Sequence, residues 1–170
     1  MRQIQFYFWV LLSFLLATLL ISLPWSKGSV DYFPKIDYLV LIYWVTYLPR
    51  VVGVLTAWGF GLLSDILFAK TYLGETAWAM SAIAYLNLLL SHRLRVFPWW
   101  QQSTIILVLI GFSQLIALLM RAFLGTGRPA DLSYWLPTLT SVLAWPFLYS
   151  LLQLYQKYCL RTGAHAVGNF

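Results

Sequence analysis

Three polar side chains, Asp65, Gln114 and Arg121, lie inside stretches of sequence that are otherwise apolar. A charge at the centre of a membrane helix costs about 2.5 to 3.5 kcal/mol, so each such charge needs a partner or a functional reason. Gln114 lies seven residues before Arg121 and shares its helix face. With Asp65 from another helix at similar depth, the three side chains could line a small polar crevice that binds a ligand or relays protons.

Simpler structural roles compete with this crevice. Asp65 and Arg121 either pair with each other or extend separately to the headgroup region, as long charged side chains do. Gln114 is better explained by hydrogen bonding between helices, which is common for buried polar groups in membrane bundles. His92 and His165 lie far apart on polar segments, so neither is expected to bind a metal.

A stripe of small residues precedes Asp65 at four-residue spacing and predicts close packing of two helices. The stripe consists of Gly53, Ala57 and Gly61. Ala77 and Ser81 form a matching small face on the next apolar stretch. Small residues let helix backbones approach closely in membranes, so we expect the two stretches to pack there, or a partner helix to dock.

The composition defines the elements that position these residues. Of 170 residues, 61% are hydrophobic and 9% charged, against about 45 to 50% and about 25% in soluble proteins. A membrane-spanning helix needs about 20 apolar residues. Six apolar runs approach this length, at residues 6–23, 35–48, 51–69, 72–90, 103–124 and 134–154. The sequence therefore predicts an all-α integral membrane protein, with residues 1–170 forming one domain of six transmembrane helices.

The connections and prolines refine this prediction. Pro49 and Arg50 separate the second run from the third and indicate the turn of an antiparallel hairpin. Pro137 and Pro146 lie inside the sixth run, where we expect them to kink the helix.

The net charge of +6 is better explained by membrane orientation than by nucleic-acid binding, because the basic residues form no stripe. With six crossings, one side carries six basic residues and no acids, and the other carries five basic residues and all five acids. The basic excess predicts that both termini are cytoplasmic. The single cysteine, Cys159, excludes a disulfide framework.

Common catalytic motifs are missing from the sequence. It has no phosphate-binding glycine loop, no zinc-binding His-Glu-x-x-His helix and no serine nucleophile elbow. Asp65 and Glu75 lie ten residues apart across a turn and do not form an obvious acid–base pair. We therefore expect no enzyme activity, no catalytic residues, no metal and no cofactor.

The middle of the chain resembles the rod shape-determining protein family MreD. The resemblance rests on the order and spacing of Leu48-Pro49-Arg50, Gly59-Phe60-Gly61-Leu62-Leu63-Ser64-Asp65, Leu73-Gly74, Ala79-Met80-Ser81, Ile83-Ala84-Tyr85-Leu86 and Trp99-Trp100-Gln101-Gln102. It is strongest over residues 34–102, and the last two helices match mainly in hydropathy and length.

The resemblance implies a function and an architecture. It implies a non-enzymatic component of the bacterial inner membrane that scaffolds its direct partner MreC and the peptidoglycan synthases, with a link to the actin-like MreB, to maintain rod shape. It also implies a compact six-helix bundle similar to the substrate-binding S component of energy-coupling-factor transporters. Membrane lipid is the other expected partner, and nucleic acid is not expected.

Two other classes of function compete with the scaffold. One is a subunit that binds a small molecule of the vitamin type for transport, with Asp65, Gln114 and Arg121 lining an outward-facing pocket. The other is a membrane enzyme of lipid or cell-wall precursor metabolism. It would need clustered acids or histidines at one leaflet, which the sequence does not offer, so the scaffold is favoured.

Overall fold

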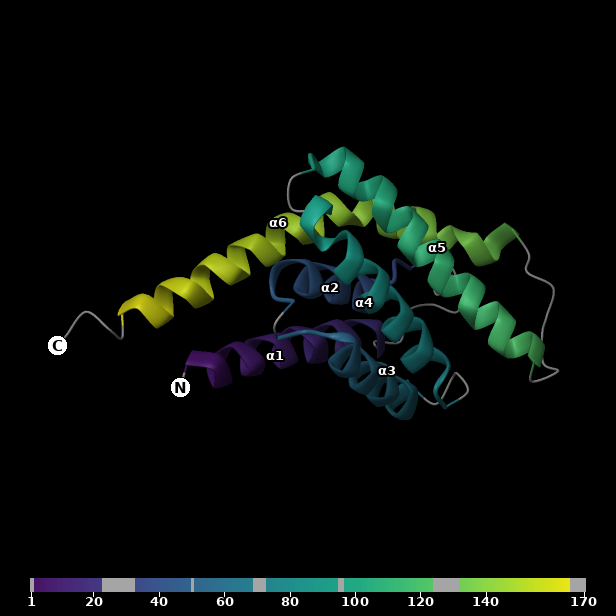
Figure 1. The fold of residues 1–170 in the computed structure, drawn as a ribbon, viewed down its shortest axis with the longest axis horizontal. Helices are drawn as coiled ribbons and strands as arrows, with labels where there is room; N and C mark the ends of the chain where they lie inside the picture. The colour runs from purple at the N-terminus through teal and green to yellow at the C-terminus, as the bar shows by residue number, and fades with distance from the viewer. Residues whose placement is uncertain are drawn as a thin grey trace.

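Six α-helices make up the computed structural model of the chain, which describes the backbone of residues 2–22, 33–49, 51–68, 73–94, 97–123 and 132–165. The helices are α1 (Arg2–Ser22), α2 (Ile36–Tyr47), α3 (Val54–Phe68), α4 (Glu75–Leu94), α5 (Trp99–Phe123) and α6 (Leu136–His165), with a short 3-10 helix, η2 (Leu132–Trp135), before α6 (Figure 1). These ranges contain no strand, so the predicted all-α class with six helices is confirmed.

One helix of the described chain, α5, is long and apolar enough to cross a bilayer, over the 24 residues Trp100–Phe123. The apolar stretches Trp9–Ile21, Ile36–Tyr47 and Val54–Leu67 are shorter. At 1.5 Å per residue the 12 residues of α2 are about 18 Å long, against a hydrocarbon core of about 30 Å. Six membrane crossings and the likeness to a transporter S component stay predictions.

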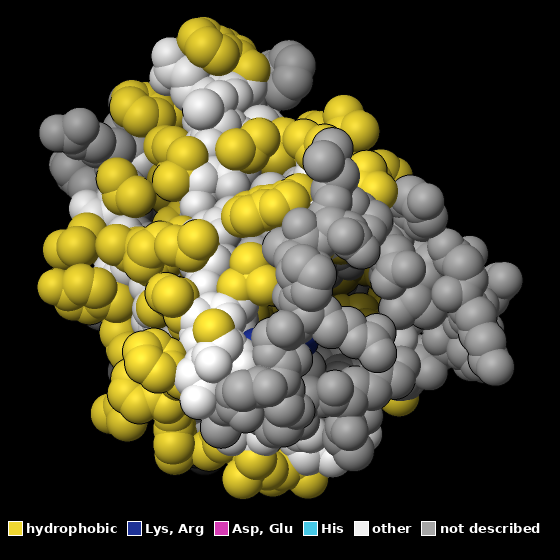
Figure 2. Space-filling view, turned by 90° about the vertical axis from the view of Figure 1, so that its right-hand side faces the viewer, with side chains coloured by type: hydrophobic (Ala, Val, Ile, Leu, Met, Phe, Trp, Pro, Cys, Tyr) yellow, Lys and Arg dark blue, Asp and Glu magenta, His cyan; other side chains and the backbone are white. Residues whose placement is uncertain are grey.

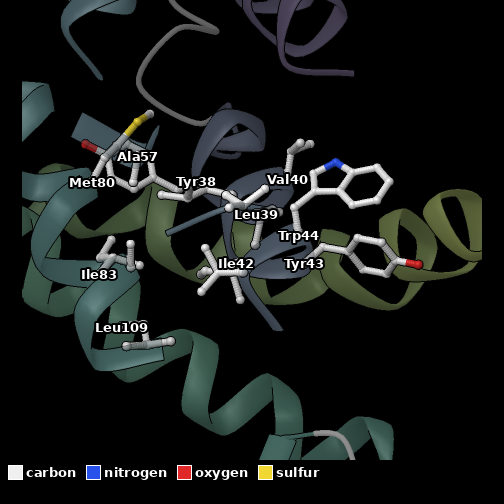
Figure 3. Close-up of a cluster of buried hydrophobic side chains, with 14 of the residues drawn as sticks. Tyr38, Leu39, Val40, Ile42, Tyr43, Trp44, Ala57, Met80, Ile83 and Leu109 are labelled. Atoms are coloured by element: carbon white, nitrogen blue, oxygen red, sulfur yellow. The ribbon is translucent and has the colours of Figure 1, made fainter. Parts of the chain in front are cut away.

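The short helix α2 forms the centre of the bundle. All nine residues from Tyr38 to Thr46 are buried. A helix that is apolar on every side has no face suited to water, so it is stable only when neighbours surround it. It packs against α4, α1 and α6, and Figure 3 shows its side chains among Met80 and Ile83 of α4 and Leu109 of α5.

The polar atoms of α2 bond to three different helices. These bonds connect Trp44 Nε1 to Ser13 Oγ of α1 (2.8 Å), Asn87 Nδ2 of α4 to the Ile42 carbonyl (2.8 Å), and the Tyr43 hydroxyl to Gln156 Oε1 of α6 (2.7 Å). A buried polar group without a partner is costly, so these bonds favour one arrangement of the helices around α2.

The connections differ in part from the sequence-based expectation. Pro49 lies in a turn, while Arg50 lies outside the described residues. The Leu48 carbonyl accepts the N–H groups of Val51 and Val52. The helix α2 packs mainly against α1, α4 and α6, whereas α3 packs mainly against α4. The antiparallel hairpin of neighbouring helices is therefore formed by α3 and α4, and not by α2 and α3 as the sequence predicts.

The position of Pro137 also differs, because α6 begins at Leu136 and places this proline in its first turn. The first turn of a helix tolerates proline, since its N–H groups have no partner within the helix. Pro146 lies inside α6 as expected.

Candidate functional site

The closest helix contact of the predicted stripe lies at Gly61, where α3 meets α4. A Cβ atom placed on Gly61 would lie 2.7 Å from the backbone nitrogen of Ala77 and 2.9 Å from the carbonyl oxygen of Thr76, and closer still to the Ala77 Cα. Real Cβ atoms essentially never approach so closely. Ala77 itself is fully buried. The two backbones are therefore nearer than any side chain at position 61 permits.

The other stripe residues have different environments. Ala57 is fully buried in the hydrophobic core. Ser81 is partly buried and donates its hydroxyl to the Ala77 carbonyl of its own helix (2.7 Å). Gly53 departs from the prediction, because α3 begins only at Val54 and a Cβ on Gly53 would meet no atom within 4 Å. The packing contact is thus centred on Gly61.

Asp65 connects the end of α3 to the start of α4. Its Oδ2 atom accepts the backbone N–H of Gly74 at 2.8 Å, and the residue is 3% exposed. Gly74 has φ +97°, a conformation that favours glycine. The carboxylate and the glycine together define the turn into α4, so the observed role of Asp65 is structural.

Removing this carboxylate is expected to destabilise the turn. In Asp65→Ala the Gly74 N–H loses its acceptor, and the free energy of unfolding should fall by about 1 to 3 kcal/mol. Asp65→Asn keeps one acceptor oxygen and should lose less. Unfolding of the purified variants in one detergent measures the difference, and equal losses in both would contradict this role.

Arg121 forms an ion pair with Glu75, the first residue of α4. The Nε and Nη2 nitrogens of Arg121 lie 2.9 and 2.8 Å from Oε1 of Glu75. The Glu75 side chain is 5% exposed and that of Arg121 is 35% exposed. The sequence indicated a charged partner for Arg121 from another helix and suggested Asp65, whereas the ion pair in the structure is with Glu75.

Two further charges lie near this pair, at the start of α2. Lys35 is within electrostatic range of Asp37, Glu75 and Arg121. We call Lys35, Asp37, Glu75 and Arg121 the charged cluster; it gathers where α2 and α4 begin and α5 ends. The apolar runs of the sequence do not point to Lys35, Asp37 and Glu75, although each of these charges lies within two residues of a helix start.

One atom of the charged cluster lacks a partner. Glu75 Oε2 is buried and accepts no hydrogen bond within the described part of the chain. The Lys35 ammonium lies 5.0 Å from the centroid of the Tyr38 ring. A buried carboxylate oxygen favours a hydrogen-bond donor beside it.

Gln114 bonds to the elements that follow α5. Its Oε1 atom accepts the Thr138 hydroxyl (2.6 Å), its Nε2 atom donates to the Tyr134 carbonyl (3.2 Å), and its own carbonyl accepts the Tyr134 hydroxyl (3.2 Å). These bonds connect α5 to η2 and α6, as hydrogen bonding between helices requires. The bonds described connect Asp65 to Gly74, Gln114 to Tyr134 and Thr138, and Arg121 to Glu75, while a polar crevice shared by the three side chains stays a prediction. No group of three metal-binding side chains occurs among the described residues.

Large apolar side chains cover much of the outside of the bundle. Examples on α1, α3, α5 and α6 are Leu15 (44% exposed), Leu55 (84%), Phe123 (88%) and Phe147 (76%). In Figure 2 hydrophobic side chains cover most of the described surface, and Lys or Arg is visible only at small places beside the grey atoms. Such a surface suits lipid chains or an apolar helix.

Comparisons with known proteins agree on one family. The family model for the rod shape-determining protein MreD matches residues 1–155. The rod shape-determining protein MreD of Haemophilus influenzae is 30% identical over 160 residues, which cover 89% of this chain and 93% of that protein. No solved structure matches significantly.

Proposed function

Because this chain belongs to the MreD family of rod shape-determining proteins, we propose that it is a non-enzymatic scaffold that positions MreC and the peptidoglycan synthases of the elongation machinery. Family membership supports the role in rod shape. The observation that favours a scaffold is that hydrogen bonds between helices hold the interior together, while apolar side chains cover the exterior.

The interior supports a fixed shape. The central helix α2 is bonded to α1, α4 and α6 through Trp44, Ile42 and Tyr43. The contact of Gly61 with Ala77 leaves no room for α3 to move toward α4. A partner that binds such a bundle meets a preorganised surface, which lowers the entropy lost on binding.

The exterior supports recognition within the membrane. Exposed apolar side chains on α1, α3, α5 and α6 offer van der Waals contact to a transmembrane segment, which is how membrane helices associate. We place the MreC segment on one of these faces. The same proposal includes six crossings of the inner membrane with both termini in the cytoplasm, and indirect links to MreB.

Site-specific crosslinking tests the scaffold. Single cysteines are placed in a Cys159→Ser background at positions exposed on different helices, and each variant is expressed with MreC. The positions are Leu15 on α1, Leu55 on α3, Leu119 on α5 and Leu143 on α6. We expect MreC to be captured from one helix face and not from the others.

Val45→Cys is the matched control, because this residue of α2 is fully buried and should capture nothing. Each variant must also restore rod shape to cells that lack the protein, which shows that the cysteine is tolerated. Variants that restore rod shape while none captures MreC would overturn direct scaffolding of MreC.

A further inference from the structure

We propose that the charged cluster binds the headgroup of a phospholipid that carries both a phosphate and a primary ammonium group, as phosphatidylethanolamine does. In this complex the ammonium donates to Glu75 Oε2, and the phosphate lies near Arg121 and Lys35. The inference goes beyond the scaffold function and does not depend on it.

The depth of the cluster suits a headgroup. Arg121 is two residues before the end of α5, and the 25 residues of this helix span about 37 Å. The hydrocarbon core is about 30 Å thick, so a helix of this length reaches the headgroup layer. Glu75 begins α4 and pairs with Arg121, which places both at the same level.

The chemistry of the cluster matches a headgroup with two opposite charges. The buried oxygen Glu75 Oε2 needs a donor, and a primary ammonium has three N–H groups to offer. Lys35 and Arg121 supply positive charge within electrostatic range of each other, which favours a phosphate. The cluster has two basic and two acidic side chains, so a headgroup of zero net charge leaves the site balanced.

The surroundings suit the acyl chains of the lipid. Leu73, just before α4, and Trp78, in the first turn of α4 with Glu75, are 76% and 60% exposed. Figure 2 views the end of the bundle where α4 begins and α5 ends, and small parts of Lys or Arg side chains are visible there beside the grey atoms. The described side chains thus combine a charged end with an apolar flank, as a bound amphiphile requires.

Native mass spectrometry of the full chain in detergent tests this proposal. The protein is equilibrated with phosphatidylethanolamine, phosphatidylcholine or phosphatidylglycerol of identical acyl chains, and with soluble glycerophosphoethanolamine. We expect phosphatidylethanolamine to be retained best. Phosphatidylcholine has no N–H group, phosphatidylglycerol has no ammonium, and the soluble headgroup lacks the apolar contacts.

Glu75→Gln is the decisive variant, because it keeps one oxygen for Arg121 and replaces the other with a donor. Its affinity for phosphatidylethanolamine should fall about tenfold, as expected for the loss of a hydrogen bond to a charged group. Lys157→Gln, an exposed change on α6, is the matched control and should bind as the parent does. Thermal unfolding of each variant shows whether it is folded.

Lys35→Gln provides a second variant that leaves Glu75 intact, and we expect it to weaken retention of phosphatidylethanolamine. Equal retention of phosphatidylethanolamine and phosphatidylcholine by the parent protein would overturn the proposal. Preference for phosphatidylglycerol would do the same, and so would unchanged binding by folded Glu75→Gln. Binding of glycerophosphoethanolamine as tight as that of the lipid would overturn the lipid as the ligand.

Discussion

Replacing Gly61 with alanine is expected to force α3 away from α4 and to lower the free energy of unfolding by about 1 to 3 kcal/mol, the usual cost of overpacking. The added Cβ would lie 2.7 Å from the backbone nitrogen of Ala77. Because the obstacle is backbone rather than the end of a flexible side chain, a whole helix must shift. Unfolding of the purified protein in detergent measures the loss.

Gly59→Ala is the matched control. Gly59 lies in the same helix, and a Cβ there would meet nothing within 4 Å. Alanine is the better helix former by about 1 kcal/mol, so this variant should be at least as stable as the parent. Equal stability of Gly61→Ala and Gly59→Ala would contradict the close packing.

A larger side chain at the same position extends the test to function. Gly61→Leu should separate the two helices further, and we expect it to lose both co-purification with MreC and the ability to restore rod shape. If the variant still co-purifies with MreC and restores normal rod shape, the result contradicts the proposal that the packing of α3 against α4 positions MreC.

Replacing Arg121 with methionine is the second change with a large expected effect. It leaves the Glu75 side chain, which is 5% exposed, without the guanidinium that pairs with it. Breaking a fully buried ion pair from one side typically costs about 3 to 5 kcal/mol. Arg121 is 35% exposed and Lys35 stays within electrostatic range of Glu75, so we expect a smaller loss here, of about 1 to 3 kcal/mol. The variant should therefore unfold at a lower temperature, or accumulate poorly in the membrane.

The double variant Glu75→Gln with Arg121→Met provides the control. With both charges removed, no uncompensated charge is left, so much of the lost stability should return. The four proteins form a double-mutant cycle whose coupling energy measures the pair. If the double variant is no more stable than Arg121→Met, the buried charge of Glu75 is not the cause of the lost stability.

The sequence predicts that small residues bring two helices together near Gly61. It does not predict that the contact stops short of Gly53. Gly61 and Ala77 face each other because four-residue spacing places small side chains on one helix face. Gly53 has the same spacing but lies directly before the helix, where its carbonyl accepts the Ala57 N–H and begins the hydrogen bonding of α3. Spacing alone does not reveal where a helix begins.

The partner of Arg121 could not be predicted for a related reason. Asp65 and Arg121 were expected at similar depth, but Asp65 accepts the Gly74 N–H and Glu75 follows directly at the start of α4. Which carboxylate reaches the guanidinium depends on the geometry of the turn, and a left-handed glycine defines that geometry. Helical periodicity contains no information about it.

The burial of α2 on every side has a consequence for how the chain assembles during synthesis. Its bonding partners come from α1, made before it, and from α4 and α6, made after it. A 12-residue apolar helix is too short to be stable alone in a bilayer about 30 Å thick. The contacts of α2 are complete only once α6 has been synthesised, so we expect the native packing around α2 to form after the last helix is made.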